Sequence, residues 1–249
     1  MRILAIADVH GQFFRFQAKE LPEADMVLLA GDLTNMGVSH DPRWRDERES
    51  MGRWIDSLQT RMPQAPILAI AGNHDLRLDW TDFNAATFLT GDPKKPYGGT
   101  DAFVHRLVDE APVRVIGESL TTCFDGPSLA ERWREMTADP KEDADRWAER
   151  PRAEVVVSHG PPYTVLDEAH AEPGIAPRWI GSAGLLGYIK RMEPRLVVCG
   201  HVHERGGQSA YLGETLVVNT ARRWCLIDLG ARSATVEEWG PTPKSGRRW

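Results

Sequence analysis

Five short apolar segments of the chain each end in a motif that carries Asp, Asn or His beside glycine. The segments read ILAIA, MVLLA, ILAIA again, EVVV and LVVC. The motifs that follow them are Asp8-Val9-His10-Gly11, Gly31-Asp32-Leu33-Thr34-Asn35, Gly72-Asn73-His74-Asp75, Ser158-His159-Gly160 and Gly200-His201-Val202-His203. Short apolar runs are typical of buried strands, and the carboxyl ends of strands form the functional edge of an open α/β sheet. The pattern therefore predicts a sheet protein whose polar motifs gather at one rim.

The rest of the pattern predicts an α/β fold, because β-rich apolar runs alternate with longer amphipathic stretches. Strands are expected at residues 2–7, 26–30, 67–71, 113–116, 154–158, 196–199, 215–219, 225–229 and 235–239. Helices are expected at residues 13–19, 43–60, 130–136, 143–149 and 184–192. The last strands leave no room for helices between them, so part of the sheet system should be antiparallel or mixed.

Length and composition favour one folded domain. The 249 residues are 41% hydrophobic and 27% charged, which excludes disorder, collagen and coiled coil and leaves enough chain for a real core. We expect a single domain over residues 1–240 and a frayed tail at 241–249. Residues 124–152 form a strongly charged helical insertion, which is either a solvated helical pair or a cap or dimer contact.

Charge and cysteine content indicate which partners and which cellular compartment to expect. The chain has 30 basic and 36 acidic residues, a net charge of −6, which argues against a broad nucleic-acid surface. No apolar run approaches the roughly 20 residues of a membrane span, and the first apolar run is interrupted at Asp8 with no signal-peptide cleavage site. The three cysteines are widely spaced and form no CxxC pair. We therefore expect a cytoplasmic protein without a membrane partner, as a monomer or a homodimer.

The donor types at the predicted rim indicate metal binding. Asp, Asn and His offer oxygen and imidazole nitrogen but no thiolate, a set that suits Mn, Fe, Zn, Co or Ni. The motifs hold more donors than one tetrahedral ion can accept, which favours two divalent transition metals that share a bridging carboxylate. Each motif alone is weak evidence, and the recurrence of such donors at five strand ends carries the prediction.

The ordered series D-x-H, G-D, G-N-H-D, S-H-G and G-H-x-H resembles the calcineurin-like metallophosphoesterases and extends from residue 8 to residue 203. The resemblance implies two mixed β-sheets packed face to face and flanked by helices, a four-layer αββα sandwich. It implies one metal on Asp8, His10, Asp32 and His203 and a second on Asp32, Asn73, His159 and His201, with Asp32 bridging. It also implies that a metal-bridging water or hydroxide attacks the phosphorus and that His74 contacts the phosphate and protonates or stabilises the leaving oxygen.

The residues themselves agree with a phosphoester hydrolase. His74 adjoins Asn73, so it should lie near the metals, and an imidazole titrates close enough to neutral pH to act as a general acid. Two divalent ions, two carboxylates and one hydroxide leave a charge of about +1, which a phosphodiester monoanion neutralises and a monoester dianion over-neutralises. This balance favours diesters, although a trivalent iron would reverse the preference.

Two features narrow the choice within the resembling family. Phosphoprotein phosphatases carry G-D-x-x-D-R-G where this chain reads GDLTNMG, so Asn35 replaces an acid that would orient the catalytic histidine and Met36 an arginine that would grip phosphate. The segments HGPPYTVLD and LVVCGHVHERGG resemble the small phosphodiesterase branch that includes the brain-type metallophosphoesterase-domain-containing proteins. The implied partner is a small phosphoester, a cyclic nucleotide or a related diester. A phosphomonoesterase or pyrophosphatase acting on a nucleotide, and a non-catalytic scaffold on the same fold, stay open as alternatives.

Overall fold

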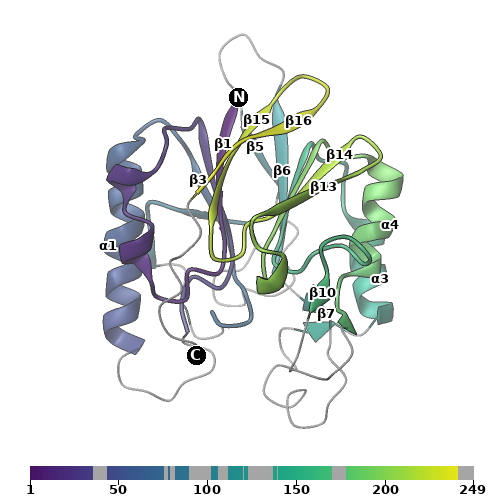
Figure 1. Cartoon of the computed structure of the whole chain (residues 1–249), viewed down its shortest axis with the longest axis horizontal. Helices are drawn as coiled ribbons and strands as arrows, with labels where there is room; N and C mark the ends of the chain where they lie inside the picture. The colour runs from purple at the N-terminus through teal and green to yellow at the C-terminus, as the bar shows by residue number, and fades with distance from the viewer. Residues whose placement is uncertain are drawn as a thin grey trace.

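The structure of the protein, a computed structural model, is built around two six-stranded sheets (Figure 1). It describes residues 1–35, 44–75, 78, 82–89, 102–105, 112–119, 121–122, 137–138, 140–169 and 178–240. The helix expected at 130–136 and the tail expected at 241–249 lie outside these residues. In the described part of the chain, no helix is long and apolar enough to cross a membrane.

The first sheet has the strand order β16-β15-β1-β2-β3-β4. Four of its strands run parallel: β1 (Arg2–Ile6), β2 (Met26–Ala30), β3 (Ile67–Ile70) and β4 (Thr87–Phe88). The other two, β15 (Trp224–Leu229) and β16 (Ala234–Trp239), pair antiparallel at the side of β1. Since β1, β2 and β3 are parallel neighbours, the loops that follow them leave the sheet at the same edge.

The second sheet has the order β13-β14-β12-β9-β6-β5. Its central strands run parallel: β14 (Thr215–Asn219), β12 (Leu196–Cys199), β9 (Val155–Ser158) and β6 (Val113–Glu118). Its edge strands, β13 (Gln208–Leu212) and β5 (Ala102–His105), pair antiparallel. Two short ladders lie outside the sheets: β7 (Thr121–Thr122) with β8 (Thr137–Ala138), and β10 (Glu168–Ala169) with β11 (Arg178–Trp179).

Side-chain alternation along the strands explains how the layers stack. On β1, Ile3 lies in the core between the two sheets and Leu4 lies in the core on the outer face. On β9, Val155 lies in the core between the sheets and Val156 on the opposite face. Successive strand residues point to opposite faces, so a strand buried on both sides is apolar throughout, as these runs are.

Helices cover the outer face of each sheet. The helix α1 (Trp44–Arg61) packs on the first sheet, and α3 (Pro140–Glu149) and α4 (Ala183–Met192) pack on the second (Figure 1). The predicted fold class, two mixed sheets face to face with helices outside, is confirmed. All nine predicted strands are present, with ends shifted by at most two residues.

The helix predicted at residues 13–19 is wrong. This segment forms two 3-10 turns, η1 (Phe13–Arg15) and η2 (Ala18–Glu20). Neither turn has a side-chain N-cap, and seven residues are too few to offset the cost of nucleating an α-helix. The apolar periodicity reflects the burial of Phe13 and Phe16 in the core beneath α1.

Candidate metal centre

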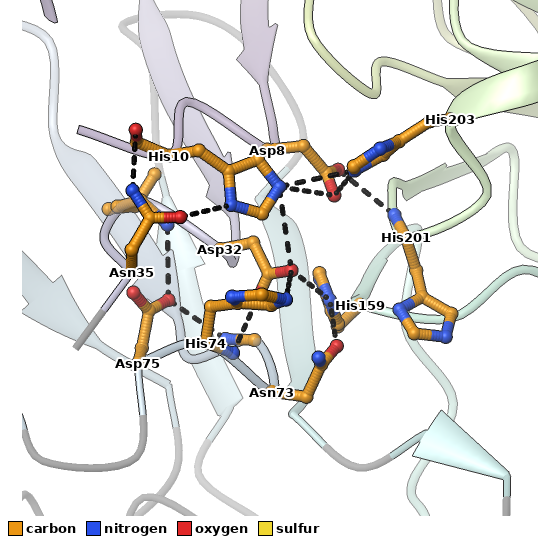
Figure 2. Close-up of polar contacts among 12 residues, drawn as sticks. Asp8, His10, Asp32, Asn35, Asn73, His74, Asp75, His159, His201 and His203 are labelled. Carbon is orange, nitrogen blue, oxygen red and sulfur yellow. Dashed lines mark hydrogen bonds and ion pairs between the residues drawn. The ribbon is translucent and has the colours of Figure 1, made fainter. Parts of the chain in front are cut away.

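Loops from both sheets deliver the predicted site residues to one place. Asp8, Asp32 and Asn73 follow β1, β2 and β3 of the first sheet, and His159 and His201 follow β9 and β12 of the second. All five strands belong to the parallel part of their sheet, so their carboxyl ends meet at the rim between the sheets. Figure 2 shows these residues gathered in one region of the rim.

The backbone at this rim is unusual. Asp8, His10, Asp32 and His201 have φ angles of 54°, 48°, 51° and 67°, in the left-handed region that favours glycine. Such a conformation costs roughly 1–3 kcal/mol at each residue and persists only where the surroundings impose it. Here the amides of Asp8 and His10 are held by the carbonyls of Gly31 and Asp32, each at 3.0 Å. Of the eight non-glycine residues with a positive φ in the described part of the chain, four are predicted ligands.

One group of donors consists of Asp8, His10 and His203. The Nε2 atom of His203 lies 2.9 Å from Asp8 Oδ1 and 3.1 Å from His10 Nε2. The other carboxylate oxygen of Asp8 accepts from the backbone amide of His201 at 2.9 Å, which ties β1 to β12. The Asp8 side chain is fully buried, whereas 37% of the His203 side chain is exposed. This group therefore opens to solvent on the His203 side.

A second group consists of Asp32, His159 and His201, with Asn73 beside it. His159 Nε2 lies 3.1 Å from Asn73 Oδ1 and 3.4 Å from Asp32 Oδ2. The rings of His159 and His201 meet edge-on, with centroids 5.0 Å apart. One nitrogen or carboxylate oxygen from each of Asp32, His159 and His201 lies within 4.8 Å of the others.

Asp32 lies between the two groups. Its Oδ2 atom is 3.4 Å from His159 Nε2 and 3.9 Å from His10 Nε2. The same oxygen is 3.9 Å from His74 Nε2, and the backbone amide of His74 donates to Asp32 Oδ1 at 2.7 Å. The structure thus brings together all seven predicted ligands and His74, with Asp32 in the position expected of a shared carboxylate.

Comparison with known proteins agrees with this arrangement. Residues 1–205 match the profile of the calcineurin-like phosphoesterases. The chain belongs to that family. Calcineurin-like phosphoesterases generally depend on two metal ions, and the candidate ligand groups described above are where this member would hold them.

Relatives and a solved structure resemble this calcineurin-like phosphoesterase over most of its length. UPF0046 protein K07C11.7 of Caenorhabditis elegans is 27% identical over 89% of this chain and 70% of its own. Metallophosphoesterase domain-containing protein 1 of Homo sapiens is 26% identical over 98% of this chain and 72% of its own. The crystal structure of TT1561 from Thermus thermophilus superposes with a TM-score of 0.59 at 18% identity, covering 95% of this chain and 97% of its own, which supports the fold.

The hydrogen bonds of two histidines test whether the site fits cations. His159 Nδ1 donates to the carbonyl of Ala30 at 2.8 Å, so in the neutral ring the lone pair is on Nε2, which faces the oxygens of Asn73 and Asp32. Likewise His10 Nδ1 lies 3.1 Å from Asn35 Oδ1, so its Nε2 lone pair faces the centre. Acceptors that face acceptors need a cation or protons between them. The donor set therefore fits the metal ions that the family uses.

Burial and neighbouring charges shift the pKa values of the side chains around the centre. Burial alone would raise the pKa of Asp32, but the positive charge on His159 lowers it below its ordinary value. Burial alone would lower the pKa of His159, but the Asp32 carboxylate raises it to about 9. Burial lowers the pKa of His201 to about 3, so this imidazole is neutral at neutral pH. In the metal-free site the proton on His159 occupies the place that a cation would take.

Asp75 is a site residue that the sequence prediction did not include. Its buried carboxylate accepts from the backbone amides of Leu33, Thr34 and Gly72 at 3.2, 2.9 and 3.0 Å, and from the Thr34 hydroxyl at 2.9 Å. It therefore clamps the loop that carries Asp32 to the loop that carries Asn73. The sequence signal was its place in the G-N-H-D motif, but its partners at Leu33 and Thr34 are some 40 residues away along the chain.

Asn35 contacts His10, which is one of the predicted metal ligands. The sequence pattern placed it where other family members carry an acid that orients the catalytic histidine. In this structure Asn35 is bonded to His10, through Oδ1 to the ring and through Nδ2 to the backbone carbonyl at 2.8 Å (Figure 2). Asn35 therefore supports His10, a member of the donor group of Asp8, His10 and His203, without being a predicted ligand itself.

Proposed function

We propose that the chain is a dinuclear metal-dependent phosphodiesterase acting on a small phosphodiester such as a cyclic nucleotide. The observation that supports it most is the convergence of seven oxygen and imidazole donors from five strand ends, with one of them, the Asp32 carboxylate, between the other six. Structural sites saturate one ion with four ligands, whereas paired ions that share a carboxylate are typical of phosphoryl-transfer hydrolases.

The ligand groups assign the two proposed ions. Asp8, His10 and His203 would hold one ion, and Asn73, His159 and His201 the other, with Asp32 between them. Bound there, two divalent ions would lower the pKa of an attacking water and offset negative charge on the phosphoryl oxygens. The protein would supply a buried cradle for them, because the Asp8 and His159 side chains are fully buried.

His74 is the residue that we propose to protonate or stabilise the leaving oxygen. Its ring lies edge-on to His10 at a centroid distance of 4.8 Å, and 22% of its side chain is exposed. Burial lowers the pKa of His74, so its imidazole is mostly neutral at neutral pH. The N–H of a neutral imidazole still donates a hydrogen bond, and His74 would direct it to the leaving oxygen at the open side of the site.

Charge supports a diester over a monoester. The seven proposed ligands include only two carboxylates, so two divalent ions and one attacking hydroxide would leave a charge of about +1, which one diester monoanion can balance. Arg205, which follows the last ligand motif, forms an ion pair with Glu168, so its positive charge is already partly balanced within the protein.

The sequence also places Met36 where phosphoprotein phosphatases carry an arginine that binds phosphate. The net charge of −6 disfavours long nucleic acids as substrates, and a cytoplasmic setting remains our expectation.

A substrate panel tests the proposal. Metal-free protein would be loaded with Mn²⁺ or Zn²⁺ and assayed with bis(p-nitrophenyl) phosphate, p-nitrophenyl phosphate, pyrophosphate and 2′,3′- and 3′,5′-cyclic nucleotides. We expect metal-dependent turnover with a higher kcat/KM for diesters than for the matching monoester. Faster monoester or pyrophosphate turnover would favour the phosphomonoesterase or pyrophosphatase alternative. Metal binding without turnover of any substrate would favour a non-catalytic scaffold.

Two variants separate the site from the fold. Asp32→Asn keeps the shape of the proposed bridging residue but removes its charge, and should lower kcat/KM by more than the roughly 100-fold upper range seen for outer-shell changes. Asp56→Asn removes the same charge from the exposed face of α1 and should leave turnover at the wild-type level.

A further inference from the structure

We infer that Glu47, on helix α1, is a positioning residue that fixes the metal-binding tautomer of His10 through Asn35. The inference rests on the proposed metal centre and adds a residue that no sequence motif singled out. Glu47 lies 12 positions after Asn35 and 37 after His10 in the chain. Its effect on the site would pass through hydrogen bonds to Asn35 and from Asn35 to His10.

Glu47 fixes which way the Asn35 carboxamide faces. Its Oε1 atom accepts from the Asn35 side-chain nitrogen at 3.0 Å and from the Asn35 backbone amide at 3.1 Å. The second N–H of the Asn35 side chain goes to the His10 carbonyl at 2.8 Å. An ionised carboxylate only accepts, so both side-chain hydrogens of Asn35 are committed and its Oδ1 atom must point the other way.

The orientation of Asn35 then decides the tautomer of His10. Asn35 Oδ1 lies 3.1 Å from His10 Nδ1, so the ring must donate from Nδ1 and keep its lone pair on Nε2. That Nε2 atom is the one that faces His203 and Asp8 (Figure 2). A flipped carboxamide would present its NH₂ group to Nδ1 and move the ring proton to Nε2, where it would point at the metal position.

Gly11 provides the space for this contact. A Cβ atom at Gly11 would lie 2.0 Å from Glu47 Oε1, and its φ angle is +71°. Because Gly11 has no side chain, the carboxylate of Glu47 on α1 can reach the loop that carries His10. The contact is half-buried, so it is shielded from competing water, which strengthens hydrogen bonds to a charged acceptor.

Matched variants on the same helix test the inference. Glu47→Ala removes both contacts to Asn35, and Glu47→Gln keeps an acceptor but adds a donor that permits the flipped carboxamide. Glu49→Gln is the control, because Glu49 is an exposed carboxylate two residues away whose partner is Arg53 on the same helix. The ring tautomer of His10 is read from long-range ¹H–¹⁵N spectra of metal-free, ¹⁵N-histidine-labelled protein, at a pH at which the imidazole is neutral. The affinity for Mn²⁺ is measured by calorimetry.

Glu47→Ala should shift His10 toward the Nε2–H tautomer and weaken one of the two Mn²⁺ sites roughly 10- to 100-fold, the range for outer-shell partners of metal ligands. Glu47→Gln should show a smaller loss, and Glu49→Gln none. If Glu47→Ala fails to fold, the His10 tautomer in the spectra of Glu47→Gln decides whether the inference holds. An unchanged tautomer and an unchanged Mn²⁺ affinity in both Glu47 variants would overturn the inference while the proposed function could still hold. Wild-type protein that binds Mn²⁺ but hydrolyses no phosphoester would overturn the proposed function and leave this inference standing.

Discussion

Single residues at the rim combine strain with function. Asp8, His10, Asp32 and His201 adopt left-handed backbone, which is costly for residues other than glycine, and each is a proposed ligand. The burial of Asp8 and Asp32 would be costly without compensation, and neighbouring imidazoles offset it by lowering the pKa of both carboxyls. Cations in the centre would take over that role. The residues are therefore organised for metal binding at the expense of local stability.

His74 should matter most when the leaving group is poor. His74→Ala removes the group proposed to protonate or stabilise the leaving oxygen, and it is expected to lower kcat for an unactivated diester by roughly 10²- to 10⁴-fold. The loss should be smaller for an aryl diester, because its leaving oxygen needs little help from a proton. Metal content should stay at the wild-type level, since His74 is not a proposed ligand. Equal losses on both substrates would contradict a role at the leaving oxygen.

The Asp75 clamp should affect stability and the site together. In Asp75→Asn one acceptor oxygen becomes an NH₂ group that faces backbone N–H donors. Leaving such buried groups unsatisfied costs about 1–3 kcal/mol, so urea unfolding of the metal-free variant should show a loss of that size. Affinity for Mn²⁺ should fall as well, because the loops of Asp32 and Asn73 lose their connection. An unfolding free energy equal to that of wild type would contradict the clamp.

At the scale of helices and strands, the contact between α3 and α4 depends on a small residue. Ser182 caps α4 by accepting from the Leu185 amide at 2.8 Å, and Asp143 of α3 accepts from the Ser182 hydroxyl and the Gly184 amide. A Cβ at Gly184 would lie 2.5 Å from the Asp143 carbonyl and 2.6 Å from Trp147. The two helices can approach this closely only because that position lacks a side chain.

Two glycine substitutions in α4 test this contact against each other. Gly184→Ala should destabilise the protein by about 1–3 kcal/mol, the usual cost of overpacking. Gly187→Ala, where a Cβ would meet nothing within 4 Å, should instead stabilise it by up to about 1 kcal/mol, because alanine favours the helix. Chemical denaturation of both variants provides the measurement, and the same sign for both would contradict the described packing.

The sequence predicted the central strands well because their apolar runs are buried on both faces. It missed β13, whose exposed and polar edge positions carry no such signal. It also predicted a helix at residues 13–19 from the spacing of Phe13 and Phe16, where the chain forms two 3-10 turns. At the site, the predicted ligands stand in local motifs at strand ends, and so could be found. Asp75 and Glu47 act through partners distant in the chain, which no local pattern reveals.

At the scale of the whole molecule, the proposed ions would connect the two sheets. Asp8, Asp32 and Asn73 come from the first sheet, whereas His159, His201 and His203 come from the second. Binding to the folded state alone stabilises it, by about 2.7 kcal/mol for one site at a free metal concentration 100 times Kd. Calorimetric unfolding should therefore show a higher Tm with Mn²⁺ than with EDTA. A Tm that does not respond to metal would mean that the sheets hold no ion between them.

The central claim is that donors from both sheets surround a pair of cations. Anomalous X-ray diffraction from crystals grown with Mn²⁺ tests it most directly, because it locates metal atoms without reference to activity. The account predicts two peaks roughly 3.5–4 Å apart, with Asp32 between them, Asp8, His10 and His203 around one, and Asn73, His159 and His201 around the other. A single peak, or peaks only at the protein surface, would contradict it.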